Sequence, residues 1–198
     1  MVFFSACIFA TLANIDALTV GISYGIKRIK IDWKSNLLIA IIGVIGTAIS
    51  LYLGNIVLNV VSSDLPRIIG AVMLILIGVW PIIKLIILKK RNKEKEDIYT
   101  CPEKYDKDKS GVLELKETIV LGTVLSVNNF ALGVGFGIIG VNILLTIMLT
   151  FLLSIGFIHI GQLLRKRNKP KILEKHTEYI SSALIILLGI LTLFFDFI

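Results

Sequence analysis

Six long apolar runs account for most of the chain, and they cover approximately residues 2–25, 36–60, 67–88, 117–140, 142–164 and 179–197. A helix that crosses a membrane needs about 20 consecutive, mostly apolar residues, and each run has this length. Only 18% of the residues are charged, whereas an ordinary soluble domain has about 25%. The sequence therefore predicts an all-α integral membrane protein with six transmembrane helices.

The placement of the basic residues indicates how these helices are oriented. Of the 21 Lys and Arg residues, 20 lie in or beside the first, third and fifth connections, and only Arg67 lies beside the second. Basic residues are enriched in cytoplasmic connections, so we expect the 89–116 connection in the cytoplasm and both termini outside. Because the net charge of +7 comes from segments between apolar runs, the expected partner is a lipid bilayer and not a nucleic acid.

The chain also contains an internal repeat. Residues 13–25 align with residues 125–137 at an offset of 112, and Gly78 aligns with Gly189 at an offset of 111. Each copy of the repeat then comprises three helices, and the two copies cover residues 1–88 and 117–198. Because each copy has an odd number of spans, the two copies have opposite orientations in the membrane. Inverted repeats are common in secondary transporters, with the substrate site near the membrane midplane. The alternative is a duplication that only builds a bundle.

Polar residues near the middle of two runs are the candidate cation pathway. Asp16 lies in the first run, and Asn128 occupies the matching position of the fourth, beside Asn129. Thr19 and Ser23 follow Asp16 on one helical face. A carboxylate at this depth costs roughly 2.5–3.5 kcal/mol on insertion scales, and oxygen ligands of this kind suit a hard divalent cation. The alternative is a protonated Asp16 that hydrogen-bonds to a neighbouring helix.

Small residues recur on a second face of the same two runs. This face carries Gly21 and Gly25 in the first run and Gly133 and Gly137 in the fourth. Small residues four apart allow transmembrane helices to approach closely. We therefore interpret these glycines as packing residues, and we expect the first and fourth helices to cross at the centre of the protein.

The central connection, residues 89–116, ends in a segment that fits a twelve-residue EF-hand calcium loop at 106–117. Its ligands would be the Asp106, Asp108 and Ser110 side chains, the Val112 carbonyl, Glu114 through water, and Glu117. The loop predicts Ca²⁺ binding. The alternative is a polar turn that caps the fourth helix.

The motifs around the two polar positions resemble those of a known family. Asn-Ile-Asp-Ala at 14–17 and Val-Asn-Asn-Phe at 127–130, each followed by spaced glycines, are similar to the manganese efflux pump (MntP-like) family, and the 106–117 loop resembles its sporulation membrane protein (YtaF) branch. The resemblance implies a six-helix bacterial inner-membrane protein of the LysE-like transporter type. It also implies export of Mn²⁺ by two aspartates, of which Asp16 matches the first, whereas Asn128 replaces the second.

Three functions follow from these observations. The first is a divalent-cation transporter that works by alternating access, with Mn²⁺ as the substrate. The second is a sporulation membrane protein that acts through partners without transport, and the third is a membrane sensor that responds to Ca²⁺ at the central loop. We do not expect an enzyme, because the sequence contains no nucleophile–base pairing and no phosphate-binding loop. No cofactor other than Ca²⁺ at this loop is indicated.

Overall fold

The computed structural model describes residues 2–60, 65–90, 111–163, 182–183, 185–187 and 189–190. The described part is helical, and its five named helices are α1 (Val2–Ile26), α2 (Trp33–Val60), α3 (Leu65–Lys90), α4 (Leu115–Ile139) and α5 (Ile143–Leu163). Each of the first five predicted spans coincides with one of these helices to within a few residues. Most of the sixth, 179–197, lies outside the described residues.

Three helices are long and apolar enough to cross a membrane, namely α2, α5 and the segment Phe3–Ile26 of α1. A fourth span is obtained if the two halves of α4, Leu115–Val127 and Asn129–Ile139, are taken together. The expectation of an all-α, multi-pass membrane protein is therefore confirmed. The number six stays a prediction. Within the described residues, the apolar stretch of α3 covers only Ile68–Trp80, which is shorter than a membrane span.

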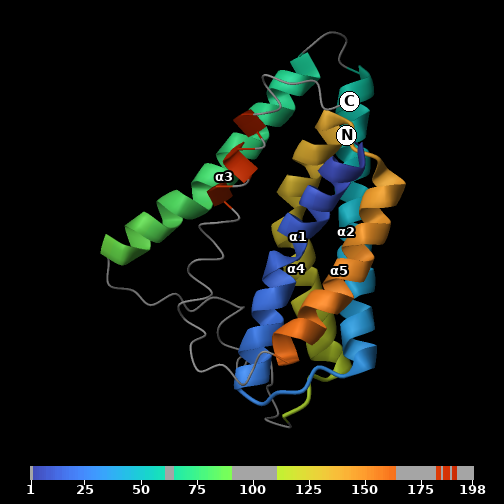
Figure 1. Ribbon diagram of the computed structural model, residues 1–198, viewed down its shortest axis with the longest axis vertical. Coiled ribbons are helices and arrows are strands. Elements are labelled where there is room, and N and C mark those ends of the chain that lie inside the picture. Colours follow the sequence, from blue (N-terminus) through green and yellow to red (C-terminus); the bar gives the residue numbers. More distant parts are fainter. Residues whose placement is uncertain are drawn as a thin grey trace.

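Four of the helices form a bundle, and α3 leans away from it (Figure 1). Within the bundle, α1 packs mainly on α5 and α2 packs mainly on α4. The first half of α3 contacts α4, where Gly70 lies against Ile138 and Ile139. We expected α1 and α4 to cross at the centre, but these two helices make few contacts with each other.

Buried glycines allow the close approaches within each helix pair. Gly21 of α1 lies against the backbone of Ile158 and Gly161 in α5, and Gly137 of α4 lies against that of Leu51 and Gly54 in α2. A Cβ atom at Gly21 or Gly137 would overlap a carbonyl oxygen of the facing helix. Lipid chains are as apolar as the side chains, so close packing of this kind holds membrane helices together.

Two clusters of buried apolar side chains fill the bundle. Near one end, the rings of Phe9 and Phe136 meet edge to face with centroids 5.0 Å apart, packed with Leu51 of α2 and Leu74 of α3. The second cluster joins the other ends of α1, α2, α4 and α5 around Tyr24. Many apolar residues are exposed on the outside, such as Ile45 and Ile49 of α2, as expected for helices that face lipid.

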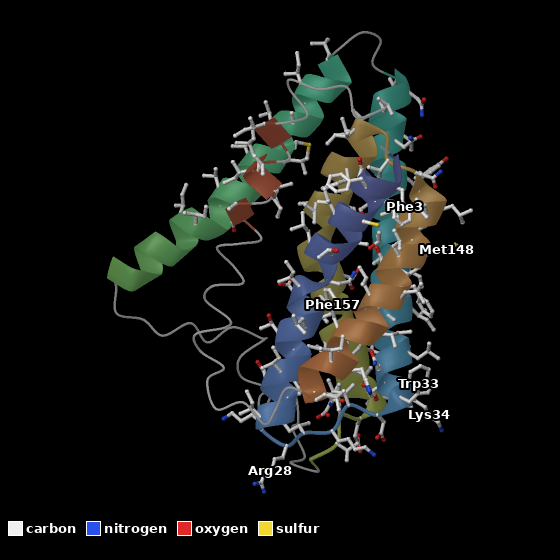
Figure 2. The ribbon with its side chains drawn as sticks, in the orientation of Figure 1. Phe3, Arg28, Trp33, Lys34, Met148 and Phe157 are labelled. Carbon is white, nitrogen blue, oxygen red and sulfur yellow. The ribbon has the colours of Figure 1, made fainter. Side chains whose placement is uncertain are left out.

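The connections 27–32 and 111–114 meet at one end of the bundle. Lys30 forms an isolated parallel β-bridge with Val112, and the hydroxyl of Ser35 donates to the Leu113 carbonyl over 3.1 Å. Figure 2 shows Arg28, Trp33 and Lys34 at this end. The chain that leaves α1 is thus tied to the chain that enters α4.

Candidate cation pathway

Asp16 lies on α1 and is half-buried. One helical turn earlier, the carbonyl of Ala13 accepts a hydrogen bond from the side-chain amide of Asn129 on α4. Asn129 is also half-buried. The contact between α1 and α4 is therefore small, but it lies next to the two positions that the sequence singled out.

Thr19 and Ser23, the other predicted pathway residues of α1, are half-buried as well. The hydroxyl of Thr19 donates to the Ile15 carbonyl one turn earlier, over 3.2 Å. A hydroxyl that donates one hydrogen bond still has oxygen lone pairs for a ligand. Asp16, Thr19 and Ser23 therefore keep oxygen atoms along one side of α1.

Asn128 lies within α4, but its side chain is outside the described residues, so its place beside Asp16 stays a prediction. The helix axis bends by 42° between Leu115–Val127 and Asn129–Ile139. Interrupted helices in transporters offer backbone carbonyls to ions. The bend thus falls at the position that the repeat matches to Asp16.

The sequence pattern did not predict two further buried oxygen atoms. The Asn36 side-chain amide of α2 donates to the Ile155 carbonyl of α5 over 3.1 Å, while its Oδ1 atom is buried without a hydrogen-bond partner among the described residues. The hydroxyl of Thr150 in α5 is likewise buried and unpartnered there. Burying a polar group without a partner costs free energy, so both atoms mark a position where another polar species can bind.

The depth of these two atoms relative to Asp16 follows from the packing of α1 on α5. Gly21 packs beside Ile158 and Gly161, and α1 and α5 run in the same direction (Figure 1). At 1.5 Å per residue, Ile155 then comes within about one turn of the level of Asp16, and Thr150 within about two turns. The spacing of Thr146, Thr150 and Ser154 by four residues in α5 is the signal that predicts a hydroxyl stripe there.

The central loop is described only from Gly111 onward. Gly111 has a positive φ of 73°, and Glu114 is the N-cap of α4. The Glu117 carboxylate accepts a hydrogen bond from the Glu114 amide over 3.2 Å, which completes a capping box. Asp106, Asp108 and Ser110 lie outside the described residues, so Ca²⁺ binding stays a prediction that a calorimetric titration of the intact protein tests. Among the described residues, no three His, Cys, Asp or Glu side chains form a metal cluster.

Comparisons with known proteins identify a family and a relative that this chain resembles. The model of the Mntp family, described as "Putative manganese efflux pump", matches residues 1–82 and 84–193. The "Probable sporulation protein YtaF" of Bacillus subtilis (strain 168) is 28% identical over 187 residues, which cover 82% of this chain and 87% of that protein. No solved structure matches the chain.

Proposed function

The chain belongs to the MntP family, and on this premise we propose that it exports a divalent cation of the Mn²⁺ type by alternating access. The observation that carries the proposal is the position of Asp16. Of the carboxylates in the described residues, it alone lies in the interior of a membrane-spanning helix. Such groups in membrane helices mark ion or proton pathways.

The proposed cation site consists of oxygen ligands from several helices. Asp16 supplies the charge, and Thr19 and Ser23 supply neutral oxygens on the same helix. Asn129 of α4, which already bonds to α1, is the proposed ligand on the facing helix. Asn128 is proposed as a further ligand because the repeat matches it to Asp16. Mn²⁺ accepts carboxylate, carbonyl and hydroxyl oxygens of this kind. With Asn128 in place of a second carboxylate, the site carries one negative charge.

Alternating access needs two halves that exchange roles around the site, and the contacts of α3 support an inverted repeat of this kind. Gly78 lies against Ile186, and Gly189 lies against Ile75. Both pairs of equivalent residues are 111 apart, so each residue contacts the counterpart of its partner. Reciprocal contacts of this type are what a two-fold axis produces.

The main helix pairs of the bundle follow the same rule. Gly21 of α1 lies beside Gly161 of α5, and Gly133 of α4 lies beside Ser50 of α2. Gly133 is 112 residues after Gly21, and Ser50 is 111 residues before Gly161. We therefore propose the repeats 1–88 and 117–198, related by an axis in the membrane plane, with the pathway between them.

A second function is favoured by one comparison. The relative from Bacillus subtilis is named as a probable sporulation protein, so a role in sporulation through partners, without transport, is the alternative proposal. The two functions differ in whether the cation content of the cell depends on this protein.

The test is a comparison of Asp16→Asn with Asp32→Asn in a manganese-sensitive host. We expect the wild type and Asp32→Asn to lower cellular manganese and restore growth, and Asp16→Asn to do neither. Asp32 is a matched control because it lies in the connection before α2, paired with Lys30 at 2.9 Å. Equal rescue by Asp16→Asn and the wild type would remove Asp16 from the pathway, and no rescue by any form would favour the sporulation proposal.

A further inference from the structure

A cavity of about 490 Å³ lies where α1 and α5 end, past Ser23, the last residue of the proposed cation pathway on α1. It is lined by Gly25, Arg28, Ile29, Lys30, His159, Gln162 and Leu163. Several of these side chains are hydrogen-bond donors and two are cations, while none is acidic. The cavity therefore has the composition of an anion site.

The backbone conformation at Arg28 does not favour an arginine. Its φ is +61°, a left-handed conformation that costs an arginine free energy but costs a glycine almost none. The repeat places Gly140 at the matching end of α4, where φ is 86°. An arginine held where its counterpart is a glycine indicates a task for the side chain.

Capping of α1 does not explain the basic residues. The amides of Arg28 and Ile29 donate to the carbonyls of Gly25 and Tyr24, over 3.3 and 3.0 Å. These bonds form a Schellman motif, which satisfies the last carbonyls of a helix through the backbone alone. The guanidinium group takes no part in these bonds, and its planar fork matches the oxygens of a phosphate group.

The surroundings of the cavity indicate how a phosphate group reaches it. Leu163 at the rim is 65% exposed, and Ile160, one turn earlier on α5, is 48% exposed. Trp33 at the start of α2 is 66% exposed at the same end of the bundle (Figure 2). Exposed apolar side chains next to a basic group, with an aromatic ring at the same end of the helices, are typical of the boundary between lipid tails and headgroups.

We propose that this cavity binds the phosphate group of an anionic phospholipid through Arg28, with Lys30, His159 and Gln162 as further donors. The acyl chains then lie along Ile160 and Leu163. Lys30 also pairs with Asp32 at 2.9 Å, so Arg28 supplies the main charge. Free phosphate presents the same chemistry, but the apolar rim favours the lipid.

Purified full-length protein in a neutral detergent tests the proposal. The unfolding temperature is measured with added phosphatidylglycerol, phosphatidylcholine or inorganic phosphate, for the wild type, Arg28→Gly and Lys34→Gln. We expect phosphatidylglycerol to stabilise the wild type more than phosphatidylcholine does. Arg28→Gly removes the cation and relieves the backbone, so this variant should fold at least as well as the wild type but bind phosphatidylglycerol about fivefold more weakly, the factor for about 1 kcal/mol per basic residue at an anionic surface.

Lys34→Gln is the matched control, because Lys34 is a cation at the same end of the bundle that does not line the cavity. It should respond to phosphatidylglycerol as the wild type does. Stabilisation by inorganic phosphate that is lost in Arg28→Gly would support the phosphate site and assign its ligand to free phosphate. An equal response of Arg28→Gly and the wild type, or an equal loss in Lys34→Gln, would overturn the site. No transport is measured, so this outcome is independent of the cation pathway.

Discussion

The Oδ1 atom of Asn36 and the hydroxyl of Thr150 are buried in the bundle without hydrogen-bond partners among the described residues. Inside a membrane, an unsatisfied polar group is retained where it serves an ion or substrate pathway. Both atoms are neutral oxygens, and both lie within about two turns of the level of Asp16. We therefore expect these two residues to pass a cation along the bundle to and from Asp16.

Thr150→Val tests this role for a single hydroxyl group, because valine replaces the hydroxyl by a methyl group and has nearly the same shape as threonine. We expect the unfolding temperature to stay unchanged or to rise, since an unpartnered hydroxyl is removed. Manganese efflux should fall by about tenfold, which corresponds to the loss of a 1.4 kcal/mol interaction in the pathway. The measurements are thermal unfolding in detergent and cellular manganese content.

Thr146→Val is the control for this substitution. Thr146 is also buried on α5, but its hydroxyl donates to the Asn142 carbonyl over 2.7 Å. Its loss should lower stability by about 1 kcal/mol with little change in efflux per folded molecule. If Thr150→Val transports as the wild type does, the hydroxyl of Thr150 has no part in the pathway.

The sequence alone predicts Asp16 as a candidate pathway residue, because a carboxylate within an apolar run is rare. Asn36 and Thr150 were not predicted. Asparagine and threonine are ordinary in membrane helices, where they usually bond to a nearby carbonyl, as Thr19 does. Only the packed structure shows that the oxygen atoms of Asn36 and Thr150 are left without a partner.

At the scale of the helix, the sequence did not predict which helices pack together, namely α1 with α5 and α2 with α4. Length and hydropathy place five helices to within a few residues, because a span is set by membrane thickness. The glycines of α1 and α4 predict close packing but not the identity of the facing helix. We expected these helices to pack on each other, whereas each packs on the second helix of the other proposed repeat.

Glycine-to-alanine substitutions test which faces pack closely. Gly137→Ala should lower the unfolding temperature, because the added methyl overlaps the backbone of Leu51 in α2, and overpacking costs about 1–3 kcal/mol. In a chain of this size, each kcal/mol corresponds to about 2–4 °C. Thermal unfolding of the purified variants measures the difference.

Gly43→Ala and Gly156→Ala are the matched controls on α2 and α5. A Cβ atom at either position has no neighbour within 4 Å, and alanine is the better helix former. Both variants should therefore be at least as stable as the wild type. Equal stability of Gly137→Ala and these controls would show that α2 and α4 are not in close contact there.

At the scale of the whole molecule, charge distinguishes the two ends of the bundle. Arg28 and Lys34 lie at the end where α1 finishes and α2 begins (Figure 2), and the connection from α4 to α5 at the other end carries no basic residue. The positive-inside rule then predicts that the end with Arg28 faces the cytoplasm. In the proposed exporter, cations are loaded from this end.

Single cysteines test the orientation in a Cys7→Ala, Cys101→Ala background. Val112→Cys and Asn142→Cys both introduce thiols at exposed positions, at opposite ends of the bundle. An impermeant maleimide should label Asn142→Cys in intact cells and Val112→Cys only after permeabilisation. The reverse pattern would invert the proposed topology and place both termini in the cytoplasm.

The pairing of α1 with α5 also governs the order in which this protein is assembled. Gly21 meets its neighbours Ile158 and Gly161 only after the intervening chain has been synthesised. At about 5–20 residues per second, that interval is on the order of 10 s. During this time α1 carries Asp16 in the bilayer before its main partner exists. The second proposed repeat therefore completes the folding of the first, and a nascent chain that stops after α3 leaves α1 without its main packing partner.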